Sequence, residues 1–128
     1  MTSTRPPIVG RYELLQDFTS HAASIRVFRL SDDDRSVEAH IHQHTTQFYV
    51  LLEGNAVIEL ENVEHTLKQY EVLEVPRESL HGARAVGGEA ILLNISVPPL
   101  RADDQVAVHP NLFHPDLALP KHGGDVED

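Results

Sequence analysis

Short apolar runs, each closed by a turn residue, constrain the fold of this chain more than any other feature. No segment between residues 8 and 97 keeps helical periodicity over the window of about 11 residues in which an amphipathic helix is recognised. Turn residues recur instead about every 8 to 12 residues, a spacing typical of an all-β sandwich or barrel. The predicted strands span residues 24–30, 37–44, 47–52, 57–60, 64–67, 72–75, 81–86 and 90–97.

Glycine, asparagine and proline mark the predicted ends of these strands. Gly54-Asn55 follows an aromatic and β-branched run and predicts a hairpin, and Gly87-Gly88 predicts a second turn. Pro76 predicts the end of another strand, because proline has no N–H to donate to a sheet.

The 128 residues suit one domain with one core. We expect that domain to span residues 1–128, with its core at about 8–97 and a Pro-rich extension at 98–128 that packs along the barrel or a neighbouring subunit. Exposed sheet edges need covering. The extension and a short strand at Ile8-Val9 are candidates for exchange between subunits, so we expect a homodimer.

Charge and cysteine content exclude several classes of partner and site. Lys and Arg number 10 against 20 Asp and Glu, a net charge of -10, which disfavours nucleic acid and anionic membrane surfaces as partners. The absence of cysteine excludes disulfides, thiolate nucleophiles and Cys-based metal sites. The first residues lack the apolar run of a signal peptide and no stretch is long enough to span a bilayer, so we expect a cytoplasmic protein.

Nine histidines remain, and two of them have the spacing of metal ligands. In a strand, His40 and His42 project from the same face about 6.5–7 Å apart, within reach of one metal ion. Gln47 begins the next predicted strand, where a bend can bring its side-chain oxygen to the same ion. His81, just past Pro76, is the best candidate for a further ligand.

The segment from Ala39 to Gly54 resembles the first motif of the cupin superfamily: His-x-His, three or four residues, Glu, six residues, Gly. His40, His42 and Gly54 match it, and Gln47 stands where the family usually has Glu. The second motif, Gly, five residues, Pro-x-Gly, two residues, His, three residues, Asn, is matched at fewer positions. Its matching residues are Pro76 and His81, while Tyr70, Glu78 and Ala85 stand at the two Gly positions and the Asn position.

This resemblance implies a double-stranded β-helix, the jelly-roll barrel of cupins, with one divalent metal held by His40, His42, Gln47 and His81. Imidazole nitrogen and amide oxygen suit Mn, Fe, Co, Ni or Zn, whereas Ca or Mg would prefer carboxylates. Glutamine in place of glutamate leaves the +2 charge of the ion undiminished, which favours Lewis-acid chemistry.

Other side chains near the motif are candidates for catalysis. Tyr49 shares the parity of Gln47 and points into the barrel as a candidate general acid, and Arg84 is a candidate clamp for a substrate carboxylate. Glu38 shares the parity of the histidines and is a candidate partner or base. His44 is expected at the pocket mouth or exposed in a turn, and Arg26 and Arg77 are alternative cations to Arg84.

We interpret the chain as a small metal-dependent cupin enzyme acting on a small oxygenated substrate, a sugar acid or carbonyl compound that can be anionic, by Lewis-acid-assisted proton transfer or isomerisation. The metal motif resembles that of pectin-degradation cupins that open unsaturated uronates, which also place Gln after His-x-His. One alternative is a dioxygenase with Fe or Mn. Another is a cupin that binds a small molecule or metal without turnover, since the fold hosts both kinds of protein.

Overall fold

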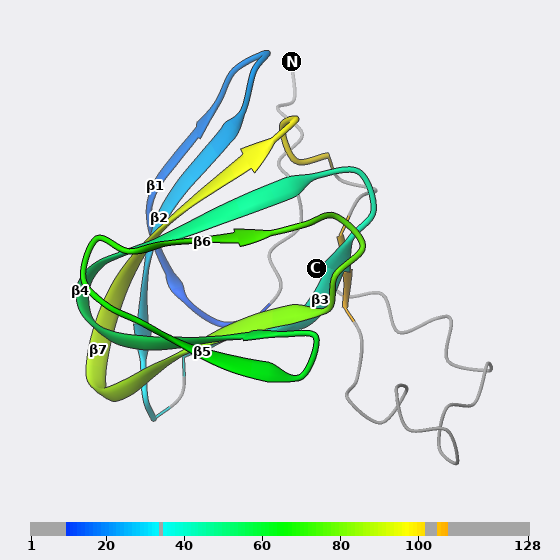
Figure 1. Cartoon of the computed structure of the whole chain (residues 1–128). Coiled ribbons are helices and arrows are strands. Elements are labelled where there is room, and N and C mark those ends of the chain that lie inside the picture. The colour runs from blue at the N-terminus through cyan, green and yellow to red at the C-terminus, as the bar shows by residue number, and fades with distance from the viewer. Residues whose placement is uncertain (1–9, 34, 102–104, 108–128) are drawn as a thin grey trace.

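Two long strands organise the fold of this protein. A computed structural model describes residues 10–33, 35–101 and 105–107, which form eight strands and no helix (Figure 1). The strands are β1 (Glu13–Thr19), β2 (Ser24–Ser31), β3 (Ser36–His42), β4 (Thr46–Leu60), β5 (Val63–Leu67), β6 (Val72–Val75), β7 (His81–Val97) and β8 (Gln105–Ala107). Because these ranges contain no helix, they offer no helical membrane span.

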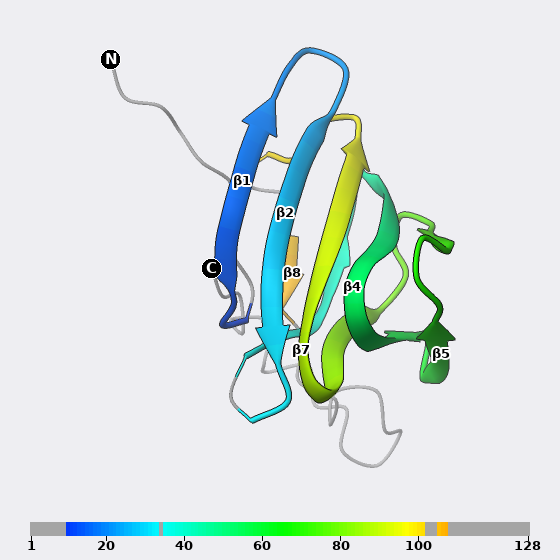
Figure 2. The ribbon, with the colours of Figure 1, turned by 90° about the vertical axis from the view of Figure 1, so that its left-hand side faces the viewer.

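The long strands β4 and β7 are antiparallel partners along most of their length, and the other strands of one eight-stranded sheet pair around them. Thr46 to Gly54 of β4 pair with Val97 to Ala90 of β7, and Ala56 to Leu60 pair with Ala85 to His81. The first half of this ladder carries β2 and β1 on one side and β6 on the other, while the second half carries β3 and β8 on one side and β5 on the other. Figure 2 shows β1, β2, β7 and β4 side by side in that order. The all-β jelly-roll prediction is confirmed.

Gly54-Asn55 does not form the predicted hairpin. β4 runs through it, with register shifts that mark irregularities at Leu51/Glu53 and Gly54/Ala56. Gly54 has φ of 82°, and a Cβ there would lie 2.1 Å from the Glu89 carbonyl oxygen. Gly87-Gly88, with φ of 69° and 136°, is likewise an internal bend of β7 rather than a turn. These glycines bend the strands without ending them.

The tight hairpin of this region lies at Glu61-Asn62, between β4 and β5. Both residues have positive φ, 52° and 67°, as a two-residue type I′ turn requires. Asparagine tolerates this conformation better than most residues. This hairpin joins the predicted strands at 57–60 and 64–67.

Several expectations concern the ends of the chain. β1 is a strand that the sequence pattern did not predict, and it pairs with β2. β8, inside the Pro-rich extension, pairs with β3. The predicted strand at Ile8-Val9 and the extension beyond residue 107 lie outside the described residues.

Inward side chains divide the barrel interior into two regions. Near the bends of β4 and β7 lies the aliphatic end, which consists of Leu30, Leu51, Ala56, Ile58, Ala85, Ala90 and Leu92. Near the opposite ends of these strands lies the histidine end, which consists of His40, His42, Gln47, His81, Asn94 and Ser96. All of these residues are buried, and both sets come from the alternating inward positions of the same long strands and their neighbours.

Candidate metal centre

Three buried histidines meet at the histidine end. His40 and His42 point inward from β3, and His81 opens β7 as the direct cross-strand partner of His40. One ring nitrogen from each of the three lies within 4.8 Å of the others. His40 Nε2 and His42 Nε2 are 3.0 Å apart. Pairing of β3 with β7 therefore joins two neighbouring histidines to one about forty residues further along the chain.

Backbone carbonyls orient two of the imidazole rings. His40 Nδ1 donates to the Glu38 carbonyl oxygen at 2.6 Å, and His81 Nδ1 donates to the Ser79 carbonyl oxygen at 3.0 Å. A neutral ring with its proton on Nδ1 presents a lone pair at Nε2. The Nε2 atoms of both rings are therefore prepared as ligands, with the hydrogen-bonded support that metal-ligating histidines usually have.

Gln47, the second residue of β4, faces the histidines with its amide oxygen. Its Nε2 donates to Asn94 Oδ1 at 3.1 Å and to Ser96 Oγ at 2.9 Å, which turns Oε1 toward His81 Nε2 at 3.0 Å. Ser96 Oγ also donates to Asn94 Oδ1 at 3.2 Å. All three side chains are at least 96% buried, so two residues of β7 determine which end of the Gln47 amide faces the cluster.

Burial keeps His40 and His81 neutral. Desolvation is the largest cause lowering the pKa of His40 well below its usual value, followed by repulsion from His81 and His42. Desolvation, with repulsion from His42, lowers the pKa of His81 to about 3. Near neutral pH these rings are unprotonated, the state in which imidazole binds metal.

His81 shows why a cation suits this cluster. Acceptors lie at both of its ring nitrogens, the Ser79 carbonyl oxygen at Nδ1 and Gln47 Oε1 at Nε2. A neutral imidazole has one N–H for these two acceptors, and its lowered pKa removes the doubly protonated form. A metal ion bound by His81 Nε2 and Gln47 Oε1 would resolve this conflict. The residues present therefore fit a divalent transition metal held by His40, His42, His81 and Gln47.

Tyr49 lies beside this cluster. It is 2% exposed, and its ring centroid is 6.0 Å from that of His81. Burial is the main cause that raises the pKa of its hydroxyl, so Tyr49 keeps its proton across the physiological range. The structure thus places the Tyr49 ring inside the barrel, beside the ring of His81.

Arg84 lies away from the histidines. Its side chain is 42% exposed and pairs with Glu64 at 3.0 Å and Glu59 at 3.5 Å. His81, Ala83 and Ala85 point inward along this part of β7, so the side chain of Arg84 points outward. The structure therefore does not bring this predicted substrate clamp to the site.

Glu38 and His44 also lie outside the cluster. A register shift in β3 between Val37 and His40 leaves the Glu38 side chain exposed, so Glu38 contributes its backbone carbonyl and not the carboxylate expected from parity. His44 is exposed in the bend after β3. An irregularity in strand pairing is invisible to a simple alternation pattern.

Sequence reasoning missed the two polar residues that hold Gln47 in place. Asn94 and Ser96 occupy inward positions of the otherwise apolar run at 90–97, on the same face as Leu92. The sequence signal that could have revealed them is two polar residues at alternate positions that face the barrel interior. Of the two alternative cations, the structure buries Arg26 inside the barrel and leaves Arg77 exposed.

Comparison with known proteins identifies the domain. Residues 26–98, more than half of the chain, match a family model described as the cupin domain. A search of curated proteins found no match. The matched segment contains all four candidate ligands.

Solved structures share the fold at low identity. An uncharacterized conserved protein with a double-stranded β-helix domain from Klebsiella pneumoniae has a TM-score of 0.63 and 16% identity, over 85% of this chain and 90% of that chain. A cupin superfamily protein from Desulfitobacterium hafniense has a TM-score of 0.58 and 24% identity, over 75% and 83%. KdgF from Halomonas sp. has a TM-score of 0.60 and 17% identity, over 72% and 79%. At these identities the likeness establishes the fold alone.

Proposed function

The chain belongs to the cupin domain family, and on that premise we propose that it is a metal-dependent enzyme that moves a proton on a small oxygenated substrate. The proposed metal ligands are His40, His42, His81 and Gln47. The proposed substrate is a sugar acid or another small carbonyl compound.

One observation carries this proposal: the donor atoms that meet at the histidine end come from three imidazoles and one amide, and none of these groups is an anionic ligand. Three imidazoles and one amide oxygen add no negative charge, and burial keeps His40 and His81 unprotonated. A divalent metal bound there supplies Lewis-acid polarisation of a substrate oxygen, and neutral ligands leave that capacity undiminished. A site that stabilised higher oxidation states would instead favour an anionic ligand.

The side chains around the cluster have separate tasks in this proposal. Asn94 and Ser96 hold the Gln47 amide so that its oxygen faces His81. Tyr49 keeps its proton because burial raises the pKa of its hydroxyl, so it donates to an oxygen that gains negative charge. The buried setting excludes bulk water and strengthens these interactions.

Metal analysis followed by anaerobic proton exchange tests the proposal. The protein is purified without chelators or nickel resin, its metal content is measured, and small sugar acids and hydroxycarbonyl compounds are incubated with it in D₂O without oxygen. We expect about one metal ion per chain and deuterium incorporation next to the substrate carbonyl. Treatment with a chelator should abolish exchange, and added metal should restore it.

His42→Ala and His44→Ala form a matched pair for this experiment. His42 is buried in the cluster and His44 is exposed two residues later. Loss of metal and exchange in His42→Ala alone supports the proposal. Metal retained by His42→Ala would contradict the ligand assignment. A loaded protein that consumes oxygen with substrate and exchanges no proton would favour the dioxygenase, and one that does neither would favour a binding protein.

A further inference from the structure

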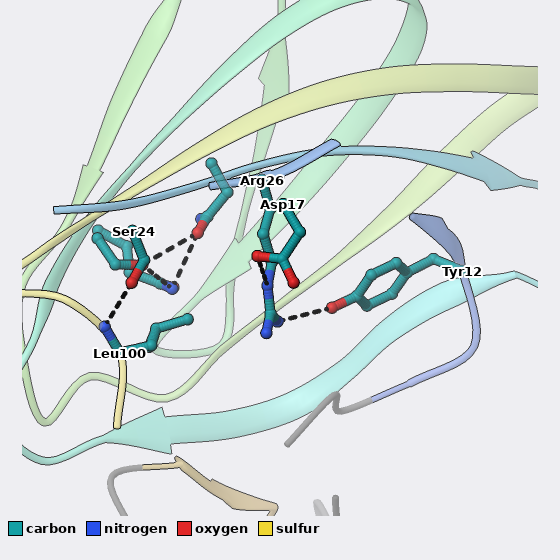
Figure 3. Close-up of polar contacts among 8 residues, drawn as sticks. Tyr12, Asp17, Ser24, Arg26 and Leu100 are labelled. Carbon is teal, nitrogen blue, oxygen red and sulfur yellow. Dashed lines mark hydrogen bonds and ion pairs between the residues drawn. The ribbon is translucent and has the colours of Figure 1, made fainter. Parts of the chain in front are cut away.

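Arg26 is an arginine buried inside the barrel, with 4% of its surface exposed. Asp17, its direct cross-strand partner on β1, contacts Arg26 Nε at 3.6 Å through Oδ1. Arg26 Nη1 donates to the Tyr12 hydroxyl at 3.2 Å. Figure 3 shows both contacts converging on the guanidinium group. They hold this cation in place within a region from which water is largely excluded.

The guanidinium lines a small interior pocket that reaches the candidate metal ligands. The pocket has a volume of about 20 Å³, which is the room that one water or one carboxylate oxygen needs. Its lining residues are Tyr12, Arg26, Phe28, Val37, His40, Gln47, Tyr49, Asn94 and Leu100. Tyr12 is the one member of this lining that is only partly buried, so it forms the side nearest solvent.

Asn94 provides a second, independent indication of an occupant. It lies directly opposite Arg26 on the neighbouring strand, so the two side chains are adjacent on the interior face. Asn94 Oδ1 accepts hydrogen bonds from Gln47 and Ser96, but its buried Nδ2 has no hydrogen-bond partner among residues 10–33, 35–101 and 105–107. A buried amide donor without an acceptor costs about 1–3 kcal/mol. The pocket therefore presents donors from both strands to whatever enters it.

Charge favours an anion over a neutral acceptor. Arg26 and Asp17 offset each other within the β1–β2 pair. This step rests on the proposed function: a divalent ion among neutral ligands would leave +2 uncompensated in the same interior. Buried charge is unfavourable without a counter-charge. Guanidinium and amide donors on adjacent strands match the paired oxygens of a carboxylate.

We propose that the pocket between Arg26 and Asn94 takes one oxygen of the carboxylate of a small organic acid, which places the acid group beside His40 and Gln47. Arg26 supplies the charge, Asn94 Nδ2 donates to one carboxylate oxygen, and Asp17 and Tyr12 orient the guanidinium. The volume of the pocket, about 20 Å³, limits the part of the ligand that enters it to an oxygen of its acid group. The substrate class is thereby narrowed to small carboxylic acids.

Titration with formate, the smallest carboxylate, tests this proposal with formamide as its neutral counterpart. Proton–nitrogen NMR of the full chain follows the Arg26 Nε–H and the Asn94 side-chain amide, in metal-free and in zinc-loaded protein. We expect formate to shift both signals and formamide to leave them in place. Because charge-assisted hydrogen bonds are the strong ones, Arg26→Gln should weaken formate binding about tenfold or more.

Arg29→Gln is the matched control, since Arg29 lies on the same strand, faces outward and pairs with Glu13 and Glu89. Its formate affinity should stay within about twofold of the parent, because exposed ion pairs contribute little. Asn94→Leu, which keeps Arg26 and Asp17 paired, should weaken binding several-fold and serves if Arg26→Gln fails to fold.

The outcomes separate this proposal from the metal proposal. Zinc binding without any formate-induced shift at Arg26 and Asn94 overturns the carboxylate pocket and leaves the metal centre standing. Shifts at those two residues in a protein that binds no metal support the pocket and overturn the metal centre. Formate and formamide acting alike, or formate binding that survives both Arg26→Gln and Asn94→Leu, would mean that the pocket holds water.

Discussion

The two ends of the barrel interior are built from the same strands with opposite chemistry. At the aliphatic end, side chains such as Leu30 and Leu92 fill space and carry no polar atom to satisfy. At the histidine end, equally buried side chains carry polar atoms, which hydrogen bonds link only in part and which leave Asn94 Nδ2 without a partner among the described residues. A few residues along β7 separate Leu92 from Ser96, so one strand passes from one chemistry to the other.

The difference teaches which end maintains the fold and which end carries chemistry. Apolar burial stabilises by about 25 cal/mol per Å². Buried polar groups contribute little net stability even when paired, and apolar replacements of the same shape are often neutral or stabilising. The histidine end is therefore not explained by stability, and four predictions follow from this contrast.

The largest effect on folding is expected at the aliphatic end. Leu92 is fully buried, so Leu92→Ala should lower the free energy of unfolding by about 2–5 kcal/mol through lost burial and the cavity left behind. Urea denaturation of metal-free protein measures this. Metal affinity of the folded fraction should be unchanged. A loss of unfolding free energy below about 1 kcal/mol would show that the aliphatic end is not the stabilising core of the fold.

At the histidine end we expect the reverse response. His81→Leu should leave the unfolding free energy of metal-free protein at pH 7 within about 1 kcal/mol of the parent, because it removes a ring with acceptors at both nitrogens. Zinc affinity should fall about 100-fold or more, since even residues that only support ligands contribute that much. Competition with a chromophoric chelator measures the affinity, and His44→Leu is the control. A loss of unfolding free energy in His81→Leu as large as that in Leu92→Ala would contradict the view that only the aliphatic end maintains the fold.

The pH dependence of stability should also come from the histidine end. The pKa of His81 is lowered to about 3 and that of His40 is lowered as well, whereas the unfolded chain protonates these rings near pH 6.5. The unfolded state therefore binds more protons below pH 6.5, and stability present above that pH is lost as pH falls toward 3. Each such ring steepens the loss by up to about 1.4 kcal/mol per pH unit.

Urea denaturation of metal-free protein between pH 7 and pH 5 measures this slope. His81→Leu should flatten the slope, and Leu92→Ala should lower the whole curve without changing its steepness. Equal slopes in the parent and His81→Leu would show that His81 does not titrate as its burial demands.

The smallest effect concerns two backbone positions outside both ends. Tyr70 and Glu78, which stand where the cupin motif has glycine, keep positive φ of 69° and 68°. The left-handed conformation costs a residue with a Cβ about 1–2 kcal/mol, and replacement by glycine removes this cost. Part of the gain is offset because glycine has more conformational entropy in the unfolded chain. Tyr70→Gly and Glu78→Gly should each raise the unfolding free energy by about 0.5–1 kcal/mol. Thermal unfolding measures this, and Gln69→Gly, next to Tyr70, should destabilise instead.

Much of the architecture could be predicted from the chain alone. Alternation and turn spacing predict an all-β barrel, and the His-x-His pattern places two imidazoles on one face of β3. The sequence shows polar residues at the inward-facing positions 94 and 96, but it does not show that Asn94 and Ser96 orient the Gln47 amide. Strand continuity through Gly54 and Gly87-Gly88 was mispredicted, because a glycine pair that bends a strand resembles one that ends it.

Local pattern and long-range pairing thus decided different things. Strand character, the facing of His40 and His42 and the absence of thiolate ligands are properties of residues and their near neighbours, so they follow from the order of amino acids. The meeting of His81 with His40, the orientation of Gln47 by Asn94 and Ser96, and the burial of Arg26 while Arg84 stays at the surface depend on register between distant strands. A one-residue shift in strand register would move every side chain of a strand to the opposite face of the sheet. Only the packing of the barrel determines that register.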